Sequence, residues 1–432
     1  MLARLHFGWF LTAILALALV LRLAAGMWWQ ERLPAGKKFG FGDSESYWEL
    51  GRTIARGQPF EYGPDRLKIF RTPGYPAILA PLFLASDEPP VFWGRAVSAV
   101  LSTLAVAAVA ALAWLLFDRA TALVAAAVAA VYPEAIALGA FVLSEAPFTP
   151  LMMLNLVFWT LAYRSPHAPR EEIISRSEMP TMGWSFASGI AGGLAVLMRP
   201  SWLLFLPFAA LIGFAAVRDT RKHAVVCLVM LIGLCLTLLP WWARNYRVAG
   251  RFVPTTLQVG ASLYDGISPM ASGASDMRFV GQFVAEQRAA DAQPGSDTKG
   301  LFEDRLDARM RRAAIDWARN NVRSVLTLVK IKLSRMWSPV PNANEFQSRW
   351  LRLILAATYT PVIVLALVGV WRFAPRDWPY LLCVLPALYF TCLHVIFVSS
   401  IRYRQPAMLP LIILAAGVLT DWMKHRYTQP DP

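Results

Sequence analysis

The chain has 432 residues, of which 56% are hydrophobic and only 16% are charged, and its formal net charge is +14 at pH 7. Soluble globular proteins have about a quarter of their residues charged, so this composition excludes an ordinary soluble protein. The four cysteines all lie inside apolar runs, and we expect them to be reduced packing residues, not a disulfide framework. They are Cys227, Cys235, Cys383 and Cys392.

Ten apolar runs are long enough to cross a bilayer as helices, since a span needs about 20 residues. They lie at 8–29, 91–117, 120–140, 144–163, 183–199, 202–217, 224–243, 350–371, 378–398 and 407–423. A further segment, 322–337, is apolar but carries Lys330, Lys332 and Arg335, so we expect an interfacial helix there. The sequence predicts an all-α polytopic membrane protein with about 10 transmembrane helices, within a range of 10–13.

The first apolar run, 8–29, is interpreted as an uncleaved span. Its basic flank and apolar body resemble a signal peptide, but Arg22 and the bulky "MWW" make a poor small-residue cleavage site.

Basic residues cluster in some of the loops that join these runs, and they predict the orientation. The basic segments are the loop 164–182, "RDTRKH" (218–223), "RFAPRD" (372–377) and the tail "KHRY" (424–427). The positive-inside rule places them in the cytoplasm with both chain ends, so 30–90 and 244–349 lie outside. This predicts an N-terminal catalytic module (1–243) with a first periplasmic loop (30–90), a periplasmic or interfacial region of roughly 100 residues (244–349) and C-terminal transmembrane helices (350–432).

The first outside loop contains "GDSESYWELGRTIARG" (42–57), which has the pattern of a short juxtamembrane amphipathic helix. Ser46 and Glu49 have capping-box spacing, which predicts a helix start at Ser46, and Gly57 is a natural stop. Asp43 then precedes the helix, and local physics alone favours a capping role for it over a catalytic one.

The same loop contains "RTPGYP" (71–76), which predicts a rigid turn. Pro73 and Pro76 each fix one backbone angle, and Gly74 permits a tight turn. Two interpretations are open: the turn re-enters the membrane surface, or it is a stiff platform that presents Arg71 to an anion.

Acids and arginines recur near the predicted outer ends of the spans. Glu134 and Glu145 lie at the ends of the third and fourth spans, where an acid usually needs a cavity, a partner or water. For Glu134, snorkelling to the interface is the simpler alternative. Arginine holds phosphate well, although each arginine alone could be an anchor beside an aromatic belt. The six arginines at this depth are Arg22, Arg95, Arg199, Arg244, Arg402 and Arg404.

Two carboxylates and several guanidinium groups at one membrane face fit a lipid-linked phosphate donor. The arginines would bind the phosphate, and a carboxylate would accept a proton from an acceptor hydroxyl. The sequence has no Gly-rich nucleotide-phosphate loop, which disfavours a cytosolic nucleotide-sugar donor.

Taken in order, the motifs resemble the bacterial membrane glycosyltransferases of family 39 type, which have the C-type glycosyltransferase superfold. Relatives include protein O-mannosyltransferases and the lipid A aminoarabinose transferase. The resemblance extends from about residue 40 to 410. It is carried by "GDSESYW", "RTPGYPAILAPLF", "VLSEAPF", "LMRPSWLLFLP", "PWWARNYRVAGRFVPTT", "GASLYDGISPMASG" and "IRYRQPAMLPLIIL".

The resemblance implies a polyprenyl-phosphate-linked sugar donor, inversion at the anomeric carbon and an active site in the first outside loop. By position, Asp43 matches the family's acid in that loop, a base or acceptor-positioning group, and Glu145 matches a second catalytic acid. Basic positions near the carrier phosphate match Arg71, Arg199, Arg402 and Arg404, and the additional candidates are Arg95, Arg244, Tyr75 and Tyr403.

The remaining partners follow from the same resemblance. The acceptor is a lipid, a glycan or a protein, no nucleic acid is involved, and the enzyme lies in the bacterial inner membrane with its site facing the periplasm. Some relatives bind a divalent metal. The sequence shows no outward-facing cluster of histidines and carboxylates, and His394 alone suits a packing role, so metal dependence is left open.

Three other functions are alternatives to this one. A flippase or transporter for a lipid-linked solute would tend to show internal repeats and polar groups near the midplane, and neither is evident here. An O-antigen ligase or polysaccharide polymerase would use a polyprenyl-linked donor but transfer a glycan. A non-catalytic assembly protein would not need paired acids beside buried arginines.

Overall fold

A computed structural model describes residues 2–163, 179–296, 298–341 and 348–428 of the chain. Over these residues the chain is helical, apart from one isolated β-bridge between Tyr62 and Leu67. The predicted all-α class is therefore confirmed. The predicted basic loop 164–182 lies mostly outside the described residues.

Eight helical segments of the described chain are long and apolar enough to cross a membrane, so this is a multi-pass membrane protein. They are α1 (Leu2–Arg32), α4 (Val91–Leu116), α7 (Glu145–Tyr163), α8 (Met179–Met198), α10 (Thr220–Ala249), α15 (Arg349–Phe373), α16 with α17 (Trp378–Leu382 and Leu385–Ile396) and α18 (Ile401–Thr428).

The prediction of ten spans is corrected to eight, or nine if a bent pair counts as one span. The run at 120–140 forms α5 (Arg119–Val131) and α6 (Pro133–Ala140), which meet at an angle of 58°. Pro133 has no N–H to continue the hydrogen bonding of α5, which explains the break. The run at 202–217 forms α9 (Phe205–Ala216), whose 12 residues are too few to cross the hydrocarbon layer.

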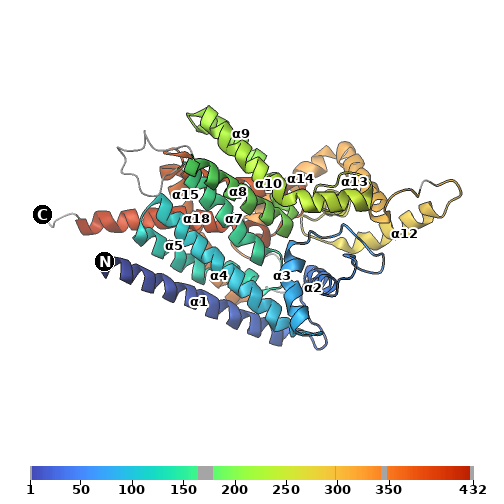
Figure 1. Cartoon of the computed structure of the whole chain (residues 1–432), viewed down its shortest axis with the longest axis horizontal. Coiled ribbons are helices and arrows are strands. Elements are labelled where there is room, and N and C mark those ends of the chain that lie inside the picture. The colour runs from blue at the N-terminus through green and yellow to red at the C-terminus, as the bar shows by residue number, and fades with distance from the viewer. Residues whose placement is uncertain (1, 164–178, 297, 342–347, 429–432) are drawn as a thin grey trace.

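The other helices gather at one end of the bundle, opposite the end where α1 begins and α18 finishes (Figure 1). They are α2 (Gly42–Ala55), α3 (Gly74–Ala85), α11 (Val259–Gly266), α12 (Val280–Asp291), α13 (Phe302–Asn320) and α14 (Val322–Met336). As expected for an interfacial helix, α14 has only 15 residues and is not a candidate span. We call this end of the bundle the capped end.

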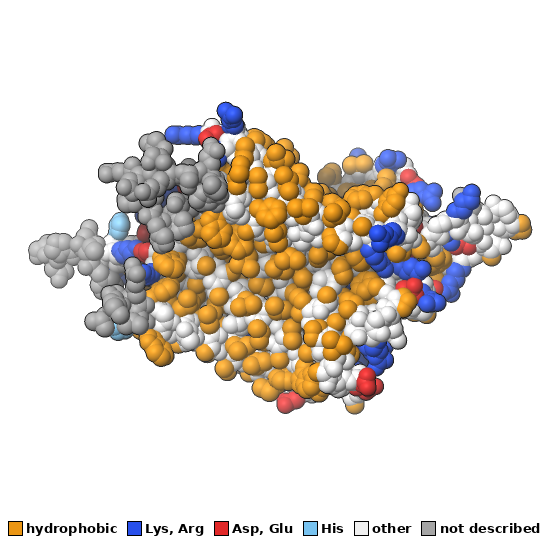
Figure 2. Space-filling view, in the orientation of Figure 1, with side chains coloured by type: hydrophobic (Ala, Val, Ile, Leu, Met, Phe, Trp, Pro, Cys, Tyr) orange, Lys and Arg blue, Asp and Glu red, His pale blue; other side chains and the backbone are white. Residues whose placement is uncertain are grey.

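The interior of the bundle is packed around small residues. In α5 the side chains of Ala122, Ala125, Ala126, Ala129 and Ala130 are fully buried, which lets α5 approach its neighbours closely. The outer surface is apolar instead of polar. Figure 2 shows a broad hydrophobic face along the middle of the bundle, with charged side chains toward its ends and edges. This distribution is what a surrounding bilayer requires.

Candidate active site

Asp43 lies in the first turn of α2, but it does not cap the helix. The helix begins at Gly42, and no side chain caps it at Phe41. The predicted capping box is therefore wrong, because Ser46 lies inside the helix and donates to the backbone carbonyl of Asp43 at 2.7 Å. The predicted stop is correct: α2 ends at Ala55, and Gly57 has a φ of 63°. The Asp43 carboxylate is left available for a partner outside the helix.

That partner is Arg71. Its Nη2 donates to Asp43 Oδ1 at 2.6 Å, its Nε donates to Ser46 Oγ at 3.1 Å, and its Nη1 donates to the side-chain oxygen of Gln258 at 3.2 Å. The guanidinium also lies 4.7 Å from the ring centre of Phe70. The Arg71 guanidinium is thus fixed by two side chains of α2 and by Gln258, which comes just before α11.

The turn predicted after Arg71 is short in the structure. It leads directly into α3 at Gly74, where a Cβ atom would approach the carbonyl oxygen of Leu197 to 2.6 Å. Only glycine permits so close an approach between the start of α3 and the end of α8. Because Arg199 follows α8 by one residue, this contact brings the Arg71 and Arg199 segments together.

Glu145, at the start of α7, anchors the second half of the site. Its side chain is fully buried, and Arg402 donates to both of its carboxylate oxygens, with Nη2 3.1 Å from Oε2. Arg199 Nη1 lies 2.5 Å from Oε1 of the same carboxylate. Both guanidinium groups rest against the ring of Tyr403, at 5.4 and 5.8 Å from its centre.

Arg402 joins the two halves, because its Nη2 also lies 3.3 Å from Asp43 Oδ2. The result is a single charge cluster at the capped end. It contains two carboxylates and three guanidinium groups, so its formal charge is one positive. Its members are Asp43, Arg71, Glu145, Arg199 and Arg402.

The two acids of the charge cluster differ in access. The Asp43 side chain is 37% exposed, whereas that of Glu145 is 0% exposed. Burial raises the pKa of Asp43, but the positive charges of Arg71 and Arg402 more than offset this, so its pKa lies below its ordinary value. Asp43 is therefore an ionised carboxylate within reach of an incoming molecule, and Glu145 is not accessible.

Arg404 lies two residues from Arg402 but belongs to a separate arrangement. It is fully buried, its Nη2 lies 2.5 Å from Glu134 Oε1, and its Nη1 donates to the carbonyls of Met336 and Ser338. Glu134 is itself buried, so the snorkelling alternative for it is wrong. Arg404 and Glu134 do not contact the charge cluster through any of these bonds.

Four other candidates form hydrogen bonds away from the charge cluster. Arg95 donates to Gln30 and to the carbonyl of Ala140, and Arg22 to Ser102 and three carbonyls. Arg244 donates to the carbonyls of Lys68 and Phe60, which fixes the segment before Arg71. The Tyr75 hydroxyl lies 2.7 Å from Ser98 Oγ. Of the six arginines expected at one depth, only Arg199 and Arg402 meet Asp43 and Glu145.

Two acids of α13 support the site and were missed by the sequence analysis. Glu303 accepts hydrogen bonds from the backbone N–H groups of Lys68 and Ile69, and Asp307 accepts one from Gly260 at 2.6 Å. The sequence does contain a pattern that indicates a structural role for these two acids. Glu303 and Asp307 share the helix face of the buried Leu306 and Met310, where an acid needs a specific partner.

Metal ligands of the kind some relatives use are not assembled in the part of the chain that the structure describes. No group of three or more His, Cys, Asp and Glu side chains there could hold an ion. His394 stacks on Tyr403 with ring centres 4.3 Å apart, and its Nδ1 lies 2.7 Å from the carbonyl oxygen of Val398. These contacts agree with the packing role expected for His394.

Solved structures with a similar fold include the oligosaccharyltransferase AglB of Archaeoglobus fulgidus. Its complex with an inhibitory peptide and a dolichol-phosphate has 17% identity and a TM-score of 0.53, over 98% of this chain and 52% of that one. The apo form has 18% identity and a TM-score of 0.56, with the same coverage. This chain spans about half the length of that protein, and the likeness shows a shared fold.

A further neighbour is ArnT from Cupriavidus metallidurans bound to undecaprenyl phosphate. It has 16% identity and a TM-score of 0.43, over 95% of this chain and 77% of that one. No protein in a set of curated sequences matches this chain.

A family model gives the remaining comparison. Residues 80–252 match the family described as dolichyl-phosphate-mannose-protein mannosyltransferase. The matched segment includes Glu145, Arg199 and Arg244 and lies between Asp43 and Arg402. This match confirms the resemblance to the membrane glycosyltransferases of family 39 type that the sequence motifs predicted.

Proposed function

We propose that this protein transfers a sugar from a polyprenyl-phosphate-linked donor to an acceptor at the periplasmic face of the bacterial inner membrane, with inversion at the anomeric carbon. The observation that carries the proposal is Asp43. It is ionised and partly exposed, and it is held between Arg71 and Arg402 at the capped end of a membrane-spanning bundle. The family match over residues 80–252 supports the same activity.

The arginines of the charge cluster suit the phosphate of the donor. Three guanidinium groups face only two carboxylates, so an arriving phosphate meets a positive site. Guanidinium groups bind phosphate through paired, charge-assisted hydrogen bonds. As the bond between the anomeric carbon and the phosphate oxygen breaks, its electron pair stays on the polyprenyl phosphate. Fixed cations stabilise the negative charge that develops there.

Asp43 acts on the acceptor. The acceptor hydroxyl oxygen forms a bond to the anomeric carbon on the face opposite the leaving phosphate, and its proton passes to the Asp43 carboxylate. A carboxylate with a lowered pKa is a weak base toward a free hydroxyl. It becomes effective because the hydroxyl becomes strongly acidic as its oxygen attacks. Asp43 therefore also positions the acceptor, through a hydrogen bond that is present before transfer begins.

Glu145 has a different role from Asp43. It is fully buried, Arg402 donates hydrogen bonds to its carboxylate, and Arg199 forms an ion pair with it. We assign Glu145 to positioning these two arginines and not to contact with the substrate. Their orientation toward the donor depends on it.

The orientation in the membrane follows from the arrangement of the chain ends. Asp43 lies in α2 and Arg71 just before α3, two helices of the capped end, which is away from the start of α1 and the end of α18 (Figure 1). Basic residues in 218–223, 372–377 and 424–427 favour the cytoplasm for the loops that carry them. The capped end then faces the periplasm. The acceptor, whether lipid, glycan or protein, approaches from that side, next to the 244–349 region.

Substitution of Asp43 tests this proposal. Asp43→Asn keeps the shape of the side chain but cannot accept a proton, so we expect transfer from a polyprenyl-phosphate sugar to fall by about 100-fold or more. Asp87→Asn is the matched control, because Asp87 lies in the same loop and forms only an exposed pair with Arg56. Full activity of Asp43→Asn, with normal membrane insertion of both variants, would overturn the catalytic assignment.

A further inference from the structure

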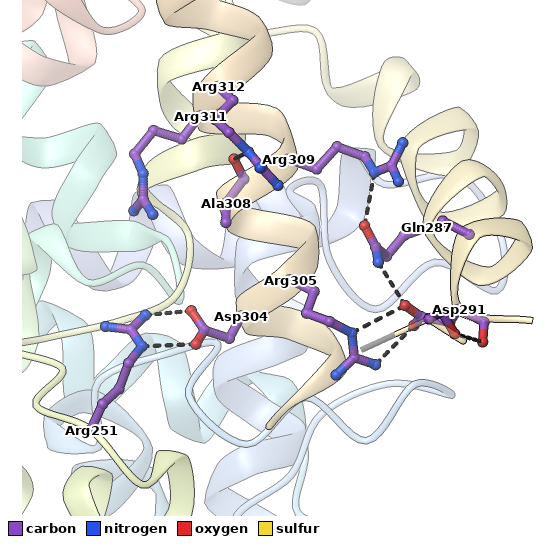
Figure 3. Close-up of a pocket in the computed structure, with 11 residues that line it drawn as sticks. Arg251, Gln287, Asp291, Asp304, Arg305, Ala308, Arg309, Arg311 and Arg312 are labelled. Atoms are coloured by element: carbon purple, nitrogen blue, oxygen red, sulfur yellow. Dashed lines mark hydrogen bonds and ion pairs between the residues drawn. The ribbon is translucent and has the colours of Figure 1, made fainter. Parts of the chain in front are cut away.

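A second polar site lies at the capped end, between α12 and α13 (Figure 3). It is an open hollow of about 500 Å³, lined by five arginines and two aspartates among the described residues. The arginines are Arg251, Arg305, Arg309, Arg311 and Arg312. We call it the arginine hollow. None of these arginines belongs to the charge cluster, and the transfer mechanism uses none of them.

Three of these arginines repeat along one stripe of α13. Arg305, Arg309 and Arg312 are spaced four and three residues apart, so their side chains are neighbours on the helix surface. Like charges at these spacings repel and destabilise a helix. The fold tolerates this repulsion at the rim of a hollow, where a bound anion would relieve it.

Three of the arginines in the hollow are already neutralised, one of them being Arg311, whose Nη1 lies 3.0 Å from Asp307 Oδ2. Arg251 forms a two-bond pair with Asp304, and Arg305 forms one with Asp291. Figure 3 shows the Arg305 pair reaching from α13 to the end of α12. These pairs build the walls of the hollow.

Arg309 and Arg312 are not neutralised in this way. Arg309 Nε donates to the neutral amide of Gln287 at 2.8 Å, and its closest carboxylate contact is a long 3.9 Å to Glu286. Arg312 donates to the carbonyl of Ala308 at 3.3 Å and has no carboxylate partner among the described residues. Both guanidinium groups keep N–H donors and positive charge for another ligand.

We propose that the arginine hollow binds a phosphate-bearing group, with Arg309 and Arg312 as its principal contacts. Guanidinium groups match the geometry of phosphate oxygens, and two of them lining one hollow favour a group with more than one negative charge. The chemistry is the same for a soluble phosphorylated molecule and for the phosphate of a membrane lipid.

A chain of hydrogen bonds connects the helix that lines the hollow to the charge cluster. Asp307, one turn before Arg311 on α13, holds the N–H of Gly260, and Gln258 two residues earlier holds Arg71. Glu303 on the same helix fixes the backbone at Lys68 and Ile69. A group bound in the hollow therefore docks on the helix that supports Arg71. The binding itself does not depend on the proposed transfer reaction.

The test measures binding of inorganic pyrophosphate to the full chain in neutral detergent, by calorimetry. We expect Arg309→Gln combined with Arg312→Gln to weaken binding about tenfold or more, since each lost charge-assisted contact is worth that order. Ala308→Glu, which puts a negative charge into the hollow, should weaken it similarly. The matched control is Arg319→Gln, on the same stripe of α13 but outside the hollow, and it should change affinity less than twofold.

Nanodiscs distinguish the source of the phosphate. If anionic lipid lowers the apparent pyrophosphate affinity of the wild type but not of the double variant, the natural ligand is a lipid head group. If anionic lipid has no effect, the ligand is a soluble phosphorylated molecule. Absence of pyrophosphate binding by the wild type, or equal loss in Arg319→Gln, would overturn the proposal.

Discussion

Arg402 and Arg404 lie two residues apart on α18, and each pairs with a carboxylate, yet their surroundings differ. Arg402 is 21% exposed and divides its donors between the accessible Asp43 and the buried Glu145. Arg404 is 0% exposed, bonds to Glu134 and two carbonyls, and stacks 3.9 Å from the ring centre of Tyr359. A buried acid–arginine pair is therefore not in itself a sign of a site. What distinguishes Arg402 from Arg404 is that Arg402 is accessible and shares its N–H donors between two carboxylates.

The first prediction tests the Arg402 side of this comparison and carries the largest effect on activity. Arg402→Gln removes the charge that links Asp43 to Glu145 and, in the proposed function, contacts the donor phosphate. We expect the rate of sugar transfer to fall by about 100- to 1,000-fold, as for the loss of one stabilising donor in an active site. The measurement is transfer from a polyprenyl-phosphate sugar in reconstituted membranes. Near-normal turnover would remove Arg402 from the site.

The second prediction tests the Arg404 side and concerns stability. Arg404→Gln leaves Glu134 buried without its cation, which should cost about 3–5 kcal/mol of folding free energy. Removing both charges with Glu134→Gln and Arg404→Gln should recover most of this loss. Thermal unfolding in detergent measures both, and the folded fraction should keep most of its activity. If Arg404→Gln were instead fully stable but inactive, the two arginines would have to exchange roles.

The third prediction is smaller and uses pH. Because the pKa of Asp43 is lowered, its ionised form persists as pH falls and is lost only below its ordinary value of about 3.9. Arg71→Gln removes one of the two cations that offset the effect of burial on Asp43. The pKa of Asp43 therefore rises. The acid limb of the pH–rate profile should therefore move to higher pH. Arg52 is an exposed residue on α2, the helix that carries Asp43, and Arg52→Gln should leave the pH–rate profile unchanged.

Much of the fold could be predicted because hydrophobic length is a local property. All ten apolar runs coincide with helices, but length alone did not reveal the bend at Pro133 or the short α9. The capping box at Ser46 failed for a different reason. The helix begins four residues earlier, and the Asp43 carboxylate bonds instead to Arg71, a distant residue in the chain.

The site was predictable in part. The motif order placed Asp43, Glu145, Arg71, Arg199 and Arg402 among the candidates, and the structure brings these five together. Spacing along the chain could not separate Arg402 from Arg404, since successive residues on a helix point about 100° apart and their neighbours come from distant segments. Glu303 and Asp307 were missed because their partners are backbone groups far away in sequence.

The charge cluster draws its members from residue 43 to residue 402, and this has a consequence for biogenesis. During synthesis, Glu145 enters the membrane long before α18 exists, with Arg199 as the first of its two cations to follow. A chain cut short before α18 would therefore keep Glu145 paired with Arg199 and Asp43 paired with Arg71, with no cation to join the two pairs. Only when α18 is complete does Arg402 join these two neutral pairs, so the positive charge of the cluster is the last feature of the site to form during synthesis.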